Sequence, residues 1–227
     1  MSNYLIVSHK PWNSSLIHSM KLVFPKDNWF FIDYKEDFNS ENLQKIAPEY
    51  VFIPHWSYLI KEDIYKSYNC IVFHMTDLPY GRGGSPLQNL ISRGFSETKI
   101  SAIVVEKQLD AGSVYLKMDL SLLGTAEEIF IRANKIIGEM ITKIINEKIK
   151  PESQIGTPTV FKRRTPEMSE ITNQLKDIGY LHDHIRMLDA EGYPKAYLET
   201  EFFKFEFTRA ALKSNGSIIS DVKITKK

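Results

Sequence analysis

Residues 70–86 read CIVFHMTDLPYGRGGSP and join a short apolar run to a glycine-rich loop. The first four residues have the length and apolar character of a strand that is buried on both faces. His74 ends that run, and Ser85 and Pro86 are residue types that cap and begin helices. The segment therefore predicts a strand, a loop and a helix in succession, with an imidazole and backbone N–H groups facing one crevice.

Three further apolar runs repeat the strand pattern on the N-terminal side of this segment. They are residues 4–7, 29–32 and 50–53, and amphipathic stretches at 13–22, 41–46 and 60–65 alternate with them. Strands that alternate with helices favour a parallel sheet, so we predict an α/β fold with a Rossmann-like, mostly parallel sheet flanked by helices. Ligands of such sheets bind beyond the carboxyl ends of the strands, which makes the residues after each run candidates for a site.

The pattern changes in the second half of the chain. Residues 99–106 and 113–120 are expected to form two strands joined by a turn. Thr125 and Glu128 have the spacing of a capping box, which predicts the start of a long amphipathic helix that Pro151 ends. The apolar stripe of that helix indicates core packing.

The C-terminal part is less periodic. It contains a strand-like stretch at residues 197–208 and a lysine-ended tail, and no internal repeat is evident. We therefore predict a main domain of residues 1–150 and a short C-terminal extension of residues 151–227 packed on its core.

The charge balance limits the partners of the protein. The 227 residues include 29 Lys and Arg against 28 Asp and Glu, which leaves a net charge of +1 and no field for gathering nucleic acid or an anionic membrane. Charges interrupt every apolar stretch before it reaches the ~18 residues of a membrane-spanning helix. We expect a cytoplasmic protein with no nucleic-acid and no membrane partner.

Cys70 is the single cysteine, which excludes an internal disulfide and a cysteine-rich metal site. Its apolar neighbours favour a buried thiol over a nucleophile. His182 and His184 are expected on a solvated helix or turn rather than in a metal site, because no carboxylate and histidine constellation accompanies them.

Taken alone, the loop after His74 is weak evidence for a function. A histidine at a strand end is more often a structural residue, and glycine-rich turns are common. The segment also lacks the lysine of a P-loop and the spacing of a dinucleotide-binding fingerprint. Asp110, which precedes Ala111 and Gly112, is by itself most simply a turn residue.

Two motifs together resemble the signatures of the folate-dependent formyltransferase family. The first is His-x-Ser/Thr-x-Leu-Pro followed by Arg-Gly, a proline and a helix. It matches at His74, Thr76, Leu78, Pro79, Arg82, Gly83, Pro86, Gln88 and Ile91. The second, Asp-x-Gly between two strands, matches at residues 110–112 with the separation that the family has, and weaker collinear likeness extends the resemblance over residues 3–198.

The resemblance implies transfer of a formyl group from 10-formyltetrahydrofolate to an amine, with residues 1–150 as the catalytic domain and no metal required. His74 would accept the proton of the amine, because histidine titrates near neutral pH. Asp110 would orient the ring, stabilise its protonated form and help to shuttle the proton.

One position departs from the family pattern. Val72 stands where the family has an asparagine that donates a hydrogen bond to the formyl oxygen. Loss of such a donor has cost about 10²–10³ in rate elsewhere. Thr76, Asn13 or a backbone N–H in the turn at residues 83–84 are the candidate replacements, and the sequence does not choose among them.

The resemblance also implies the binding residues. The folate pocket would be lined by Pro54, His55, Trp56, Leu109 and Asp110. The acceptor substrate would be contacted by Lys10, Trp12, Asn13, Asp77 and Tyr80. For Trp56 a core position and for Asp77 an exposed loop position are equally good interpretations.

A further resemblance of the loop implies the class of the acceptor. The string from His74 to Pro86 looks similar to sugar N-formyltransferases of bacterial surface-glycan pathways, including pseudaminic-acid-type pathways. The methionyl-tRNA branch carries a larger C-terminal domain and needs a basic RNA surface, and the glycinamide ribonucleotide branch keeps the Asn-x-His pattern. We expect a nucleotide-linked amino-deoxysugar as the acceptor.

Two other classes of function stay open. A formyl-folate hydrolase would use the same histidine and aspartate with water as the acceptor, and a catalytically impaired module would bind folate or a nucleotide sugar without turnover. The sequence leaves the oligomeric state open, and a homodimer is compatible with it.

Overall fold

The computed structural model describes residues 1–227, apart from the side chain of Pro11. It divides into two compact units that each combine three segments of the chain, whereas the expected division cuts the chain once, at residue 150. The first unit contains Met1–Arg82, Lys99–Leu120 and Ile131–Val160, and the second contains Gly83–Thr98, Ser121–Phe130 and Phe161–Lys227.

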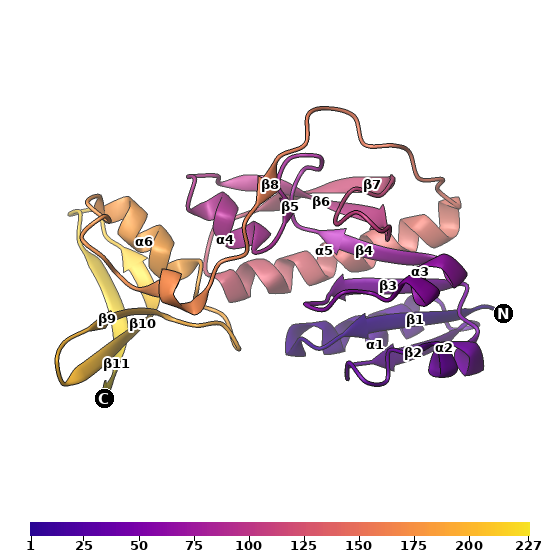
Figure 1. The fold of residues 1–227 in the computed structure, drawn as a ribbon, viewed down its shortest axis with the longest axis horizontal. Coiled ribbons are helices and arrows are strands. Elements are labelled where there is room, and N and C mark those ends of the chain that lie inside the picture. The colour runs from indigo at the N-terminus through magenta and orange to yellow at the C-terminus, as the bar shows by residue number, and fades with distance from the viewer. The chain divides into compact units, whose positions relative to one another are not determined.

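The first unit is built on a six-stranded sheet with the order β2-β1-β3-β4-β6-β7 (Figure 1). Its strands are β1 (Asn3–Ser8), β2 (Asn28–Ile32), β3 (Tyr50–His55), β4 (Cys70–His74), β6 (Glu97–Val104) and β7 (Val114–Ser121). The first four strands pair in parallel, and β6 pairs with β4 in the antiparallel direction. The predicted mostly parallel sheet is therefore confirmed.

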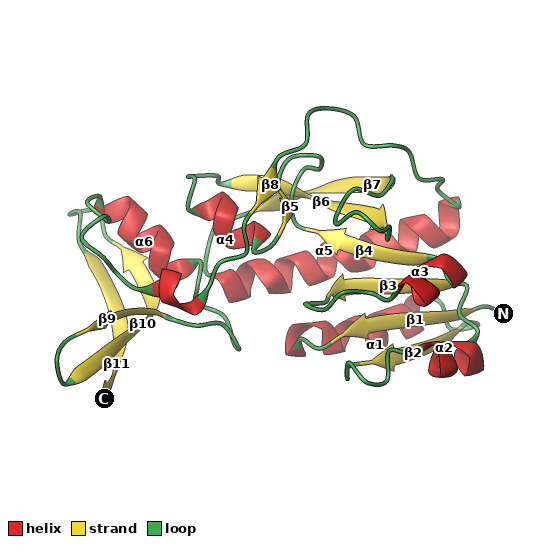
Figure 2. Cartoon of the chain, viewed as in Figure 1, coloured by secondary structure: helices red, strands yellow, loops and turns green.

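The helices also follow the sequence pattern (Figure 2). They are the short turn η1 (Pro11–Asn13), α1 (Ser14–Val23), α2 (Ser40–Ile46), α3 (Glu62–Ser67) and the long α5 (Ala126–Glu147). The predicted capping box opens α5: Thr125 N donates to Glu128 Oε2 over 2.8 Å, and Glu128 N donates to Thr125 Oγ1 over 3.3 Å.

The core of the first unit joins the parallel strands to α2 and α3. Leu5 and Val51 of the sheet pack with Leu43 of α2 and Ile64 of α3, and all four side chains are inaccessible to solvent. Burial of each such side chain contributes about 1.5–3 kcal/mol. Cys70 belongs to the same cluster, which confirms the predicted buried thiol.

The second unit contains short helices and an antiparallel sheet. The helices are α4 (Pro86–Ile91), η2 (Pro166–Ser169) and α6 (Ile178–Arg186), and the sheet has the order β11-β10-β9. Its strands are β9 (Ala196–Glu199), β10 (Phe203–Leu212) and β11 (Ile218–Lys226). A further two-stranded sheet pairs β5 (Arg82–Gly83) with β8 (Val160–Phe161), and each of these strands has its first residue in the first unit and its last in the second.

Two local expectations are wrong. The stretch 197–208 is not one strand, because a tight turn separates β9 from β10: Thr200 N donates to Phe203 O over 2.8 Å. Pro86 does begin α4, but Ser85 does not cap it. The Ser85 hydroxyl instead accepts a hydrogen bond from Arg164 N at 3.1 Å, so a tertiary contact replaces the local one.

Among the described residues, none of the helices is long and apolar enough to cross a membrane.

Removal of a core side chain tests this packing. We expect Leu5→Ala to lower the free energy of unfolding by about 2–5 kcal/mol, because it leaves a cavity among fully buried neighbours. Leu22 lies on α1 with 69% of its surface exposed, and Leu22→Ala should change stability by less than about 0.5 kcal/mol. Urea denaturation measures both values, and equal losses would contradict the assigned core.

Candidate active site

His74 and Asp110, which are far apart in the sequence, meet in the first unit. His74 is the last residue of β4 and lies opposite Ser101 of β6. Its Nδ1 atom is 3.5 Å from Asp110 Oδ2, and its Nε2 atom is 2.8 Å from the carbonyl oxygen of Gly81. The two side chains are only 8% and 12% exposed. The predicted pair therefore exists, and both groups sit near the protein surface without lying open to it.

The hydrogen bonds assign the tautomer of His74. A carbonyl oxygen can only accept, so Nε2 must carry a hydrogen to bond with Gly81. In the neutral ring Nδ1 then holds the lone pair, and this atom faces the Asp110 carboxylate. A proton taken up at Nδ1 would sit between the imidazole and a carboxylate, which is a suitable place for a general base.

The turn that carries Asp110 is tightly constrained. Asp110 has a left-handed backbone with φ of 53°, which costs a residue with a side chain roughly 1–2 kcal/mol. Ala111 N donates to Gln108 O over 3.2 Å, and Gln154 Nε2 donates to the carbonyls of Asp110 and Gly112 over 2.9 and 2.8 Å. At Gly112 an added Cβ would lie 1.9 Å from the Val104 carbonyl oxygen, so only glycine fits.

The loop after His74 is held by residues of β6 and β7. Ser101 Oγ donates to Thr76 O over 2.7 Å and accepts from Leu78 N at 3.3 Å. Lys117 Nζ contacts the Leu78 carbonyl and forms an ion pair with Asp77 Oδ1 at 2.5 Å. Asp77 is thus an exposed loop acid with a cationic partner, which is one of the two interpretations that the sequence left open.

Thr76 is fully buried, and its hydroxyl donates to the Gly81 carbonyl over a long 3.5 Å. The observed contact of this side chain is therefore inside the loop. Tyr80 is half-buried in the same loop, and its backbone N–H donates to Asp77 O over 3.1 Å.

The carboxyl ends of β1 and β3 form a second group of predicted residues beside β4. Ser8 and His55 lie opposite each other in the register, and Ser8 Oγ donates to His55 O over 3.2 Å. Asn13 is buried, and its Nδ2 atom donates to Ser8 Oγ over 2.8 Å. The Asn13 amide therefore holds the end of β1, a contact that neither of its predicted roles requires.

Aromatic and basic side chains gather at these strand ends. Lys10 Nζ lies 5.5 Å from the centroid of the Trp12 ring, and the His55 ring meets Trp12 edge to face at 5.5 Å. Trp56 packs edge to face on Phe38 at 5.6 Å and on His9 at 5.5 Å. Trp56 also packs against the core cluster, so it contributes to the core while half-exposed.

Burial shifts the pKa of the basic side chains at these strand ends. It lowers the pKa of His55 to about 3, with repulsion from Lys10 and His9 adding to the effect, so His55 is neutral at pH 7. Burial also lowers the pKa of His9 and of Lys10. His9 Nδ1 is buried and has no hydrogen-bond partner among the described residues.

Pro54 and Leu109 complete the predicted folate-binding set. Pro54 is buried within β3, whereas the side chain of Leu109 is 59% exposed beside Asp110. The structure thus arranges the predicted residues in two groups, at the end of β4 with the Asp110 turn and at the ends of β1 and β3.

Val72 and Cys70 of β4 have structural roles. Val72 packs against the core cluster and offers no hydrogen-bond donor. Burial raises the pKa of the Cys70 thiol to about 12, so the group is protonated at neutral pH and is no nucleophile.

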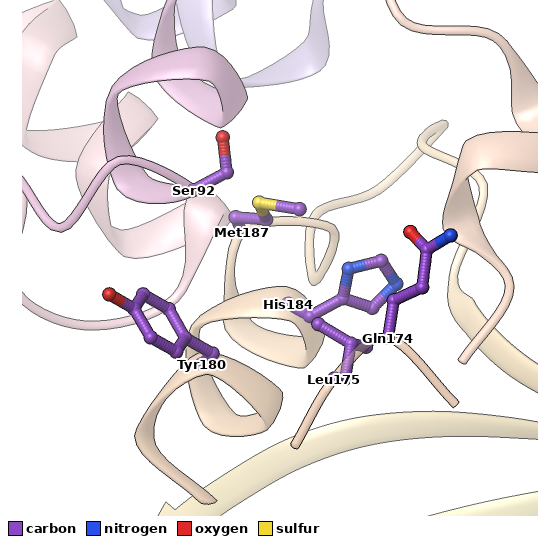
Figure 3. A pocket seen from close by; sticks show the side chains of 6 residues that line it. All are labelled: Ser92, Gln174, Leu175, Tyr180, His184 and Met187. Atoms are coloured by element: carbon purple, nitrogen blue, oxygen red, sulfur yellow. The ribbon is translucent and has the colours of Figure 1, made fainter. Parts of the chain in front are cut away.

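The second unit contains a pocket of about 100 Å³ that no predicted site residue lines (Figure 3). Its lining residues are Ser92, Gln174, Leu175, Tyr180, His184 and Met187. His184 is buried, which corrects its expected solvated position, and its Nε2 atom donates to Ser169 O over 3.1 Å. The part of the chain that the structure describes contains no group of three or more His, Cys, Asp or Glu side chains placed to hold a metal ion.

Sequence reasoning missed Gly81, Ser101, Lys117 and Gln154. Ser101 and Lys117 lie inside predicted strands, and Gln154 lies in a segment without periodicity. Gly81 bonds to His74 within one loop, whereas Ser101, Lys117 and Gln154 contact residues that are distant in the sequence, so no local pattern marks those three.

Comparison with known proteins decides the family. A family model described as the methionyl-tRNA formyltransferase C-terminal domain matches residues 166–225. Over 100% of both chains, this protein is 47% identical to a solved structure titled methionyl-tRNA formyltransferase from Clostridium thermocellum, with a TM-score of 0.97. The chain belongs to the formyltransferase family. Its α/β fold with a mostly parallel central sheet is the formyltransferase fold.

This formyltransferase-family chain also matches longer proteins. It is 22% identical over 171 residues to methionyl-tRNA formyltransferase of Bacillus licheniformis and 25% identical over 197 residues to that of Francisella philomiragia. These alignments cover 72% and 82% of this chain but 54% and 62% of the relatives. The chain therefore spans a little over half the length of the curated relatives that it matches.

Two further structures share the formyltransferase fold at low identity. HypX from Aquifex aeolicus in complex with tetrahydrofolic acid has a TM-score of 0.74 at 14% identity and covers 93% of this chain and 38% of its own. A sugar N-formyltransferase from a Shewanella species has a TM-score of 0.68 at 14% identity and covers 97% of this chain and 96% of its own.

The expected likeness to sugar N-formyltransferases is thus supported for the fold. The match over residues 166–225 corrects the expectation that the C-terminal part sets this formyltransferase-family chain apart from the methionyl-tRNA branch.

The Asp110 turn provides a stability test of the site. We expect Gly112→Ala to lower the free energy of unfolding by at least about 2 kcal/mol, because the new methyl group meets a backbone carbonyl that cannot move away. Gly94 has a φ of +80° and open space around it, so Gly94→Ala should cost only roughly 1–2 kcal/mol. Thermal denaturation compares the two, and a smaller loss in Gly112→Ala would contradict the assigned turn.

Proposed function

We propose that this protein transfers the formyl group of 10-formyltetrahydrofolate to the amine of a nucleotide-linked amino-deoxysugar in surface-glycan biosynthesis. The observation that carries the chemistry is the 3.5 Å approach of His74 Nδ1 to Asp110 Oδ2 at the end of a sheet strand. Membership of the formyltransferase family supports the reaction class.

His74 and Asp110 have complementary tasks in this reaction. The Gly81 carbonyl keeps a hydrogen on His74 Nε2, so the attacking amine loses its proton to Nδ1. Asp110 Oδ2 then accepts a hydrogen bond from the new Nδ1–H and holds the positive charge of the ring. The proton can return from Nδ1 to the leaving nitrogen.

The residues at the strand ends fit a reduced folate. A pterin is a planar heterocycle with donors and acceptors along its edge. His9 Nδ1 is buried without a partner among the described residues, and its ring lies 5.5 Å from Trp56 and 5.6 Å from Tyr58. When bound, the formyl-folate supplies an activated formyl carbon. The residues that would hold it are Pro54, His55, Trp56, Leu109 and Asp110.

No asparagine stands at position 72 to donate a hydrogen bond to the formyl oxygen. The Val72 side chain has no donor, and Thr76 and Asn13 both donate to protein oxygens. Gly84 N donates to the Phe161 carbonyl over 3.3 Å. We therefore expect slower turnover than an enzyme with the asparagine would have.

The charge distribution supports a small acceptor. Residues 161–227 carry twelve Lys and Arg residues against ten Asp and Glu residues, which gives little field for binding a polynucleotide. Lys10 and Trp12, at the end of β1, offer a cation and an aromatic face to a nucleotide-linked sugar.

Methionyl-tRNA is the second candidate acceptor. The match of residues 166–225 to the methionyl-tRNA formyltransferase C-terminal domain and the names of the relatives favour it. The formyl-folate hydrolase remains a third candidate because the same two residues could activate water. The non-catalytic binding module remains a fourth because of Val72.

One assay separates these candidates. The protein is incubated with 10-formyltetrahydrofolate and, in parallel, with a panel of nucleotide amino sugars, with initiator methionyl-tRNA or with no acceptor. We expect tetrahydrofolate release and a formylated product only with an amino sugar, detected by absorbance and product mass. Formylated methionyl-tRNA, formate release without an acceptor, or folate binding without turnover would each replace the proposal by one of the alternatives.

Variants of the central pair test the chemistry. We expect His74→Ala and Asp110→Asn each to lower kcat about 10²–10⁴-fold, because proton transfer loses its base or the partner of that base. The exposed His18 and Asp119 provide matched controls, and His18→Ala and Asp119→Asn should keep full activity. Circular dichroism checks that all four variants fold. Full activity in a folded His74→Ala or Asp110→Asn protein would rule out the assigned roles.

A further inference from the structure

Gln154 connects the two motifs from which the site is built. It lies in the segment of the first unit between α5 and β8, which arches away from the end of α5 in Figure 1. Its Oε1 atom accepts hydrogen bonds from Arg82 Nε at 3.2 Å and Arg82 Nη2 at 2.7 Å. Its Nε2 atom donates to the carbonyls of Asp110 and Gly112 over 2.9 and 2.8 Å. One half-buried carboxamide therefore contacts the loop after His74 and the turn that carries Asp110.

The partners fix the orientation of this carboxamide. A guanidinium group can only donate and carbonyl oxygens can only accept, so the oxygen must face Arg82 and the nitrogen must face the turn. A glutamate has the same shape, but its two oxygens could satisfy Arg82 alone. The chemistry of this position is therefore specific to an amide of this length.

The backbone of the turn at Asp110 is held by hydrogen bonds to its carbonyl groups. Asp110 has a left-handed backbone, and its peptide neighbours must be held for that conformation to persist. Gln154 binds the carbonyls of Asp110 and Gly112, the two residues that flank Ala111, so it restrains the backbone that aims the Asp110 carboxylate at His74. It acts on the backbone of the turn through the Asp110 and Gly112 carbonyls.

We propose that Gln154 is a positioning residue for formyl transfer. It holds the Asp110 turn so that the Asp110 carboxylate stays next to His74 Nδ1. This inference rests on the proposed function. A shift of about 1 Å in a catalytic group can cost about 100-fold in rate, so loss of the restraint should act on turnover more than on substrate binding.

Two variants distinguish the hydrogen bonds that the Gln154 carboxamide donates from those that it accepts. Gln154→Glu keeps an acceptor for Arg82 and removes both donors to the turn, whereas Gln154→Met keeps the length of the side chain and removes every hydrogen bond. Gln44 is an exposed glutamine on α2, and Gln44→Glu makes the same chemical change away from the site. Circular dichroism and thermal denaturation establish that each variant folds.

Two measurements test the proposal independently. The first is hydrogen exchange of the backbone amides of residues 107–113 in the protein without ligands, followed by mass spectrometry. We expect exchange there to rise at least about tenfold in both Gln154 variants. The second is steady-state kinetics with the acceptor found for the wild-type protein. We expect kcat to fall about 10- to 100-fold in both variants, with the KM for the acceptor changed by less than about threefold. Gln44→Glu should leave both measurements unchanged.

The outcomes distinguish the restraint of the Asp110 turn by Gln154 from the proposed function of the protein. Unchanged exchange in residues 107–113 would overturn the restraint itself. Faster exchange with an unchanged kcat, or with a loss confined to KM, would overturn the positioning role and leave a structural contact. Failure of the wild-type protein to transfer formyl to any acceptor would refute the proposed function and the positioning role with it, whereas the exchange result would still report on the restraint.

Discussion

Parallel pairing of β1, β3 and β4 is the constraint on which the candidate site depends. It brings the carboxyl ends of three strands to one edge of the sheet, and Ser8, His55 and His74 are the last residues of those strands. The strands hold this arrangement because their side chains are buried on both faces. A shift of one residue in the register would move each apolar side chain to the opposite face of the sheet, where it would meet different packed neighbours, so the core packing also fixes the site.

The second half of the site depends on the reversal of direction at β6. This strand runs antiparallel to β4, which sets Ser101 opposite His74 and leads the chain back to the turn at Asp110. The close approach of Gly112 to the Val104 carbonyl and the hydrogen bonds from Gln154 hold that turn. Backbone restraints therefore aim the carboxylate, and the His74 hydrogen bond to Gly81 aims the imidazole.

Burial gives the two groups of site residues different electrical characters. At the ends of β1 and β3, desolvation disfavours the charged forms of His9, Lys10 and His55, and the His55 ring is neutral at pH 7 beside its aromatic neighbours. At the end of β4, a carboxylate faces an imidazole that can take up a proton. A planar, uncharged heterocycle suits the first environment, and proton transfer from an amine suits the second.

The sequence by itself determined the strands of the six-stranded sheet, the helices among residues 1–150, the capping box of α5 and the buried thiol, because each depends on the spacing of nearby residues. The resemblance of two motifs was sufficient to pair His74 with Asp110. Only the tertiary structure decided how Thr76, Asn13 and Ser85 use their polar groups, where the strand over 197–208 breaks, and which residues support Asp110. Ser85 and the Asp110 turn bond to Arg164 and Gln154, which are distant in the sequence, so the path of the intervening chain determines those contacts. Thr76 and Asn13 bond to residues only five positions away, but the conformation of the folded loop determines which oxygen each side chain reaches.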